Sequence, residues 1–183
     1  MTSPQAATAF RGAIVSPSLT LPSVALTDTS GRPWNLAQRA KGRVTAVYFG
    51  YTNCPDVCPT DMADLATARR SLPMSARDNV DIVFVTVDQK RDTRPVIRTW
   101  LDRFDPTIVG LTGTPAQLAA AAGAMHIPYS AKTTAKGLEE VQHSSQMTAV
   151  GHDGVSRLVW LSGTAVGDIA RDMQLLVSGQ VPS

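Results

Sequence analysis

The sequence has very few cysteines, because only two occur in its 183 residues. A secreted scaffold held together by disulfides carries more of them, spread along the chain, so this class of protein is excluded. The two are Cys54 and Cys58, and a bridge between them would close too small a loop to stabilise the fold much. We therefore interpret the pair as a chemical site and not as a structural staple.

The chain also lacks long apolar segments and a dominant charge. No stretch reaches the about 18 consecutive apolar residues of a membrane-spanning helix, and the N-terminus does not have the pattern of a signal peptide. Charged residues make up 17% of the chain, the formal net charge is +2, and the basic residues are scattered. This composition argues against a nucleic-acid partner and against binding to a membrane surface.

The length and the hydrophobic content of 43% predict one globular domain with a sizeable core. Residues 1–21 are rich in Ser, Thr, Pro and Ala, and we interpret them as a flexible N-terminal lead-in. Residues 22–183 then form the domain, which we expect to be a monomer.

The order of the expected elements predicts the fold. Residues 44–50 and 80–87 are apolar and rich in β-branched residues, which indicates buried strands. The other expected elements are a β-hairpin at 24–36, helices at 60–72, 94–104, 114–125 and 163–177, and strands at 108–111, 146–150 and 156–161. The helix at 114–125 begins with a helix-start signature, in which Thr114 is the N-cap, proline takes the first helical position and Gln117 the third. This order favours an α/β protein with a thioredoxin-like fold, in which helices flank a mixed central sheet and the β-hairpin forms an N-terminal extension.

The cysteine pair follows the strand at 44–50, at the carboxyl end where such sheets place ligands. Residues four apart on a helix have Cβ atoms about 5–6 Å apart, whereas a disulfide prefers about 3.5–4.5 Å. Two thiolates bound at about 2.3 Å from one metal ion tolerate the wider spacing. The spacing therefore allows a redox-active disulfide and suits a metal chelate well.

The prolines around the pair suggest its local structure. Pro55 and Pro59 each follow a cysteine and disfavour the α conformation there, so we expect an exposed loop through Cys54 that leads into a helix beginning near Pro59 or Thr60. The positive end of that helix would face the sulfurs and lower their pKa. The alternative is a pair of buried structural cysteines.

A third ligand would complete a metal site, because thiolates combined with an imidazole select copper or zinc. His126 lies at an expected helix end and His152 in a hairpin turn that we expect to be exposed. His143 follows a polar loop at 132–142 and precedes the strand at 146–150, so it is the best placed of the three, although spacing alone leaves a structural role equally open. Met62 and Met147 are better interpreted as core residues than as ligands.

Three segments together resemble one known family. The run from Tyr48 to Thr60, the run from Val85 to Thr93 and the His143-Ser-Ser segment resemble the signature of the Sco/SenC copper chaperones. The similarity extends from about Pro22 to the last expected helix. The sequence departs from the family at Gln89, where proline is frequent, and in the turn at His152.

The resemblance implies an extracytoplasmic thioredoxin-like domain, tethered to the cell membrane through a segment absent from this chain. It implies that Cys54, Cys58 and His143 bind Cu(I) or Cu(II). It also implies a role in assembling the binuclear copper centre of cytochrome c oxidase, as copper donor, as thiol reductant or as both. The expected partner is the copper-accepting subunit of the oxidase or another copper chaperone.

Other functions are compatible with the same residues. Cys54 and Cys58 form the redox pair if the protein is a thiol-disulfide oxidoreductase or a redox sensor without a copper-delivery role, and Cys54 is the reactive residue if it is a peroxiredoxin. The acidic residues Asp56, Asp88 and Asp92 could orient His143 or tune the thiolates. For Asp88 and Asp92 we favour a simpler interpretation, a strand end and a helix N-cap.

Overall fold

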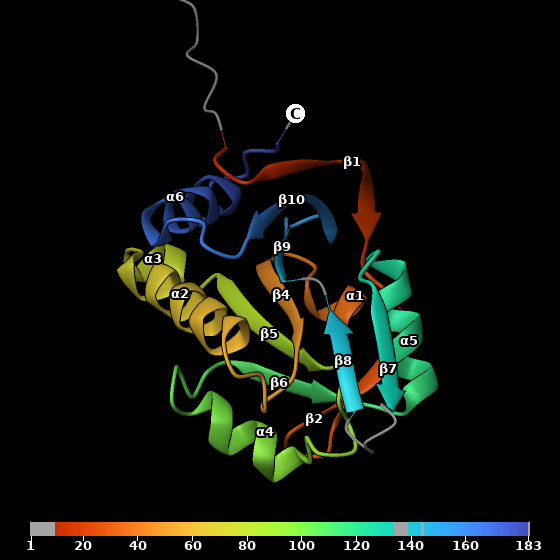
Figure 1. Cartoon of the computed structure of the whole chain (residues 1–183). Coiled ribbons are helices and arrows are strands. Elements are labelled where there is room, and N and C mark those ends of the chain that lie inside the picture. The colour runs from red at the N-terminus through yellow and green to blue at the C-terminus, as the bar shows by residue number, and fades with distance from the viewer. Residues whose placement is uncertain (1–9, 134–138, 144, 183) are drawn as a thin grey trace, which may run out of the picture.

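An eight-stranded mixed β-sheet forms the centre of the molecule (Figure 1). The computed structural model describes residues 10–133, 139–143 and 145–182, and it describes no side chains between 129 and 144. Across the sheet, the strands are β1 (Ala13–Thr20), β10 (Val155–Leu161), β9 (Gln146–Val150), β4 (Val44–Gly50), β5 (Val80–Thr86), β6 (Val109–Thr112), β2 (Ala25–Asp28) and β3 (Pro33–Asn35). Strands β4, β5 and β6 run parallel, and the other neighbours are antiparallel.

Helices cover both faces of this sheet. One face packs against α2 (Val57–Ser71), α3 (Met74–Arg77), α4 (Arg94–Leu101) and α6 (Val166–Val177), and the other against α1 (Leu36–Arg39) and α5 (Pro115–Ala124). In Figure 1, α2, α3 and α6 lie on one side of β4 and β5, whereas α1 and α5 lie on the opposite side. The predicted thioredoxin-like α/β fold, with its β2–β3 hairpin, is confirmed.

Strand β4 explains why the sequence predicted buried central strands so clearly. Every residue of β4 is buried, because both of its faces are covered by helices. Its side chains alternate between the two cores: Ala46 and Tyr48 belong to the cluster on the α2 side, and Val47 and Phe49 to the cluster on the α5 side.

The start of α5 follows the sequence prediction closely. The Thr114 side chain accepts a hydrogen bond from the Gln117 backbone N–H at 3.3 Å, and the Gln117 side chain accepts one from the Thr114 N–H at 2.8 Å. This reciprocal capping box satisfies two amide groups that the helix itself leaves without partners. Pro115 occupies the first turn, where its missing N–H costs nothing.

The interpretation of residues 13–20 as part of a loose lead-in is wrong. They form β1, which pairs antiparallel with β10, so that Ala13 lies opposite Val159 and Thr20 lies opposite Val155. Seven of the eight β1 side chains are exposed or half-buried, so the strand lacks the alternation that sequence reasoning depends on. The buried carboxylate of Asp172 in α6 also accepts hydrogen bonds from the amides of Arg11 and Gly12, which fixes the chain just before β1.

The prediction of a polar loop at 132–142 is also wrong in part. Strands β7 (Tyr129–Thr133) and β8 (Glu139–His143) pair antiparallel in a separate two-stranded sheet, with Tyr129 opposite His143. Figure 1 shows this hairpin beside α5. In the part of the chain that the structure describes, no helix is both long and apolar enough to cross a membrane.

Candidate metal centre at the end of strand β4

The two cysteines lie directly beyond the carboxyl end of β4. The chain turns between Tyr51 and Cys54, and the Cys54 amide closes this turn by donating to the Tyr51 carbonyl at 3.2 Å. Helix α2 begins at Val57, so Cys58 is its second residue. The Cys58 amide donates to the Cys54 sulfur at 3.4 Å, and neither cysteine forms a disulfide. The backbone therefore brings the Cys54 sulfur against the first turn of α2.

The helix begins earlier than the prolines predicted. Cys58 is helical although Pro59 follows it, because Pro59 then occupies the first turn, where no helical hydrogen bond is lost. Asp56 is the N-cap residue, is exposed and makes no side-chain capping bond.

Both thiols are buried, which corrects the expectation of an exposed loop. Cys54 is 9% exposed and Cys58 is 0% exposed. Burial raises the pKa of the Cys58 thiol to about 12, and a hydrogen bond with Cys54 acts in the same direction. The expected lowering of the pKa by the helix end is therefore wrong for Cys58, because the cost of removing a thiolate from water outweighs the field of the helix terminus.

A group of buried polar residues surrounds Cys58. The Tyr48 hydroxyl interacts with the Cys58 sulfur and with the carboxylate of Asp61, and burial is the main cause that raises the pKa of Tyr48. Asp61 lies three residues after Cys58 in α2, is fully buried, and accepts a hydrogen bond from the Ser162 hydroxyl at 2.8 Å. Since Tyr48 stays protonated at neutral pH, its hydroxyl is available as a donor beside the sulfur.

Asp92 holds the turn that carries Cys54. Its fully buried carboxylate accepts hydrogen bonds from the Thr52 amide at 3.0 Å, from the Thr52 hydroxyl at 2.5 Å and from the Thr86 hydroxyl at 2.6 Å. Burial raises the pKa of Asp92, and these three bonds oppose that shift. The interpretation of Asp92 as a helix N-cap is wrong, because Thr93 is the N-cap residue of α4.

Asp88 follows the end of β5, as the simpler interpretation expected. It is 3% exposed and forms an ion pair with Arg91. Its backbone amide donates to the Thr86 hydroxyl at 3.0 Å. Asp88 therefore belongs to the same hydrogen-bonded group as Asp92 at the end of β5.

The backbone of His143 lies at the same end of the sheet as the cysteines. Met147 pairs with Tyr48, and β9 runs antiparallel to β4, so Gln146 lies toward the carboxyl end of β4. His143 ends β8 three residues before Gln146, a distance that an extended chain spans in at most about 11 Å. The side chain of His143 lies outside the described residues, and within those residues no group of three His, Cys, Asp or Glu side chains forms a metal site.

The other two histidines lie away from the cysteine pair. His126 is exposed at the end of α5, as expected. His152 is half-buried rather than exposed, because its Nε2 atom lies 3.2 Å from the Val177 carbonyl at the end of α6. It belongs to the β9–β10 turn, and Val150 before that turn pairs with Thr45 at the start of β4.

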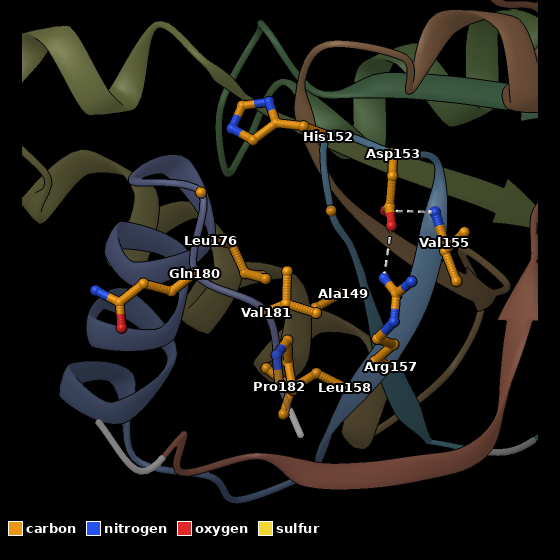
Figure 2. Close-up of a pocket in the computed structure, with 12 residues that line it drawn as sticks. Ala149, His152, Asp153, Val155, Arg157, Leu158, Leu176, Gln180, Val181 and Pro182 are labelled. Carbon is orange, nitrogen blue, oxygen red and sulfur yellow. Dashed lines mark hydrogen bonds and ion pairs between the residues drawn. The ribbon is translucent and has the colours of Figure 1, made fainter. Parts of the chain in front are cut away.

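A cavity of about 220 Å³ lies at this opposite end of the sheet. Figure 2 shows its walls, formed by the β9–β10 turn, by β10 and by the chain after α6, with Asp153 bonded to Arg157 at 2.7 Å. Leu158, Leu176 and Val181 supply apolar surface. This cavity is separate from the cysteine pair.

Met62 and Met147 are fully buried core residues, as expected.

Sequence reasoning missed several residues of the site. Asp61 could have been noticed, because its position three after Cys58 places both on one face of a helix. The hydroxyl of Ser162 and the clamp on Thr52 left no local signal, since their partners are 101 and 40 residues away in the sequence.

Comparison with known proteins identifies the family. A model of the SCO1/SenC family matches residues 16–178. A candidate copper-binding protein of Stutzerimonas stutzeri is 33% identical over 137 residues, which cover 75% of this chain and 67% of that protein. The chain matches smaller shares of other curated relatives, down to 26% of their length.

Solved structures agree with this assignment. Apo Sco1 of Thermus thermophilus superimposes with a TM-score of 0.82 at 30% identity, over 93% of this chain and 99% of that one. Copper-bound ScoI of Bradyrhizobium japonicum gives 0.77 at 28% identity, over 86% and 99%. The matched family model runs from within β1 to just after α6, and the solved structures share the fold, so the chain belongs to the SCO1/SenC family.

Proposed function

We propose that this chain is a copper chaperone that binds one Cu(I) or Cu(II) ion through Cys54, Cys58 and His143. One observation carries the proposal: two cysteine thiols that form no disulfide lie beyond the carboxyl end of β4, linked by a hydrogen bond across the first turn of α2. The chain belongs to the SCO1/SenC family, and a similar structure, that of Bradyrhizobium japonicum ScoI, has copper bound. His143 enters as the third ligand because its backbone lies at the same end of the sheet.

This donor set suits copper as a cargo. Thiolates and imidazole are soft or borderline ligands, which favour copper over hard cations such as Mg²⁺ and Ca²⁺. Three protein ligands leave one side of the ion open, so that a ligand of a partner can attack there and take the ion by exchange. Because Cys58 is protonated at neutral pH, binding of the ion releases its proton.

The acceptor in this proposal is the copper-binding subunit of cytochrome c oxidase, or another copper chaperone that acts before it. The protein would act as a monomer on the extracytoplasmic side of the membrane, held there by a tether. These statements rest on membership of the SCO1/SenC family.

The same thiols could also serve as a reductant. In that reaction Cys54 and Cys58 form a disulfide while a disulfide of the partner becomes two thiols, so two electrons and two protons pass to the partner. A Cys54–Cys58 disulfide has no thiolate left for copper, and the redox state of the pair would therefore control copper binding.

Titration of the reduced protein with Cu(I), Cu(II) and Zn²⁺ tests the copper proposal. We expect one copper ion per chain, and thiolate-to-Cu(II) charge-transfer absorption that disappears in Cys58→Ser and His143→Ala. The matched control is His126→Asn, because His126 is exposed and has a φ of 53°, which asparagine tolerates. Unchanged copper binding by His143→Ala would refute the ligand assignment.

The alternative is a thiol-disulfide oxidoreductase without a role in copper delivery. Its second cysteine would be a poor attacking group at neutral pH, because the pKa of Cys58 is raised. This alternative predicts turnover on a small disulfide substrate that neither a copper chelator nor His143→Ala affects. Such turnover, combined with no stoichiometric copper binding, would favour it over the chaperone.

A further inference from the structure

The hydrogen bonds around Asp92 connect the cysteine turn to the neighbouring strand. The backbone pairing of β4 and β5 ends with the bond from the Val87 amide to the Gly50 carbonyl at 2.8 Å. The Asp92 carboxylate adds a second link between the two strands at this end, because it accepts from Thr52, just after β4, and from Thr86, the last residue of β5. A side chain thus continues the connection where the sheet itself stops.

Thr52 is the residue through which this connection reaches Cys54. It lies inside the turn that the Cys54 amide closes onto the Tyr51 carbonyl, and Asp92 binds both its amide and its hydroxyl. Two bonds to one residue fix the orientation of the turn as well as its position. The other end of the pair, Cys58, is fixed independently, because it is part of α2 and fully buried.

We propose that Asp92 is a positioning residue, whose clamp on Thr52 sets the place of the Cys54 sulfur relative to Cys58 and so determines how tightly the pair holds copper. This inference deepens the proposed function and rests on it. The physical reason is preorganisation: a turn that is already held in the binding geometry loses less conformational freedom when the ion binds. All three partners donate to the Asp92 carboxylate. An amide in its place has no negative charge and only one acceptor oxygen, so it weakens these bonds while it keeps the shape of the side chain.

The chain offers a matched control in Asp172. This aspartate is also fully buried and also accepts from three groups, the amides of Arg11 and Gly12 and the indole N–H of Trp160. It lies in α6 and bonds to no residue of the cysteine turn. Asp92→Asn and Asp172→Asn therefore remove similar buried contacts at two different places.

The experiment compares copper affinity and copper spectra of the two variants with those of the unaltered protein. We expect Asp92→Asn to bind Cu(I) about 10- to 100-fold more weakly, as for other residues that orient metal ligands, and to shift the thiolate-to-Cu(II) absorption bands. Asp172→Asn should leave both unchanged, although both variants melt at lower temperature. Equal weakening in the two variants, or no weakening in Asp92→Asn, would overturn the proposal.

Two further measurements keep the proposal testable on its own. If Asp92→Asn does not fold, Thr52→Val removes only the hydroxyl contact, and it should weaken copper binding in the same direction. If the unaltered protein binds no copper, the proposed function fails, but the clamp can still be read from the equilibrium between the two thiols and glutathione disulfide. In that equilibrium Asp92→Asn should form less Cys54–Cys58 disulfide than the unaltered protein, while Asp172→Asn should form as much; identical values for all three would refute the clamp.

Discussion

Gly50 is the residue at which one added methyl group should disturb the cysteine site most directly. It ends β4, and a Cβ atom built on it lies 2.7 Å from Cε1 of Tyr48, 3.2 Å from the Cys58 sulfur and 3.2 Å from Cε2 of Phe84. Its φ is not in the left-handed region, so alanine meets no backbone strain and the whole effect comes from crowding. The change Gly50→Ala therefore isolates the packing around Cys58.

The expected size of this effect follows from the contacts. Non-bonded carbon atoms pack at about 3.5–4.0 Å, so the Tyr48 ring or the strand must move by roughly 1 Å. The rings of Tyr48 and Phe84 stack at 6.5 Å between centroids in the buried core, so neither can swing into solvent. Overpacking of this kind costs about 1–3 kcal/mol, which for a chain of this size lowers the melting temperature by roughly 2–12 °C.

The assay is urea unfolding followed by circular dichroism, together with copper titration. Gly123→Ala serves as the control, because Gly123 lies in α5 and an added Cβ there has no neighbour within 4 Å. Replacing a helical glycine by alanine at an open position should stabilise the protein by about 0.5–1 kcal/mol. The same glycine-to-alanine change should therefore lower the free energy of unfolding at Gly50 and raise it at Gly123. A Gly50→Ala protein within about 0.5 kcal/mol of the unaltered one, with unchanged copper binding, would refute this account of the packing.

Three other predictions test the fold and its titration. The metal-free protein should lose stability as the pH rises from 9 toward 12, because the pKa of Cys58 is raised from 9.0 to about 12 and the unfolded chain ionises first. Cys58→Ala should remove up to about 1.4 kcal/mol per pH unit of that loss. Urea unfolding at several pH values measures it, and an equal dependence of the unfolding free energy on pH in both proteins would contradict the prediction. Thr114→Ala should cost about 1 kcal/mol through loss of the capping box, read from the urea midpoint, whereas no change would mean that the box adds nothing. Leu65→Ala, at a fully buried position of α2, should cost about 2–5 kcal/mol, and a cost below 1 kcal/mol in the same assay would show that the core beside Cys58 is loosely packed.

Local patterns predicted much of the fold. The continuous apolar run of β4 and the capping box at Thr114 each depend on residues close together in the sequence, and both have the structure that was expected. Strand β1 was missed because its side chains are mostly exposed and its partner β10 lies far along the chain. Strands β7 and β8 were missed because a polar segment carries no periodic apolar signal.

The sequence by itself determined the α/β fold, the family and the position of the cysteine pair after a buried strand, because these depend on patterns within short segments. Only the tertiary structure decided the state of the thiols: Cys58 is buried and its pKa is raised, against the local expectation from the helix end. The tertiary structure alone also revealed the Asp92 clamp on Thr52, since that contact joins residues 40 positions apart. Burial and long-range hydrogen bonds arise when separate elements pack together, and no short segment of the sequence contains that information.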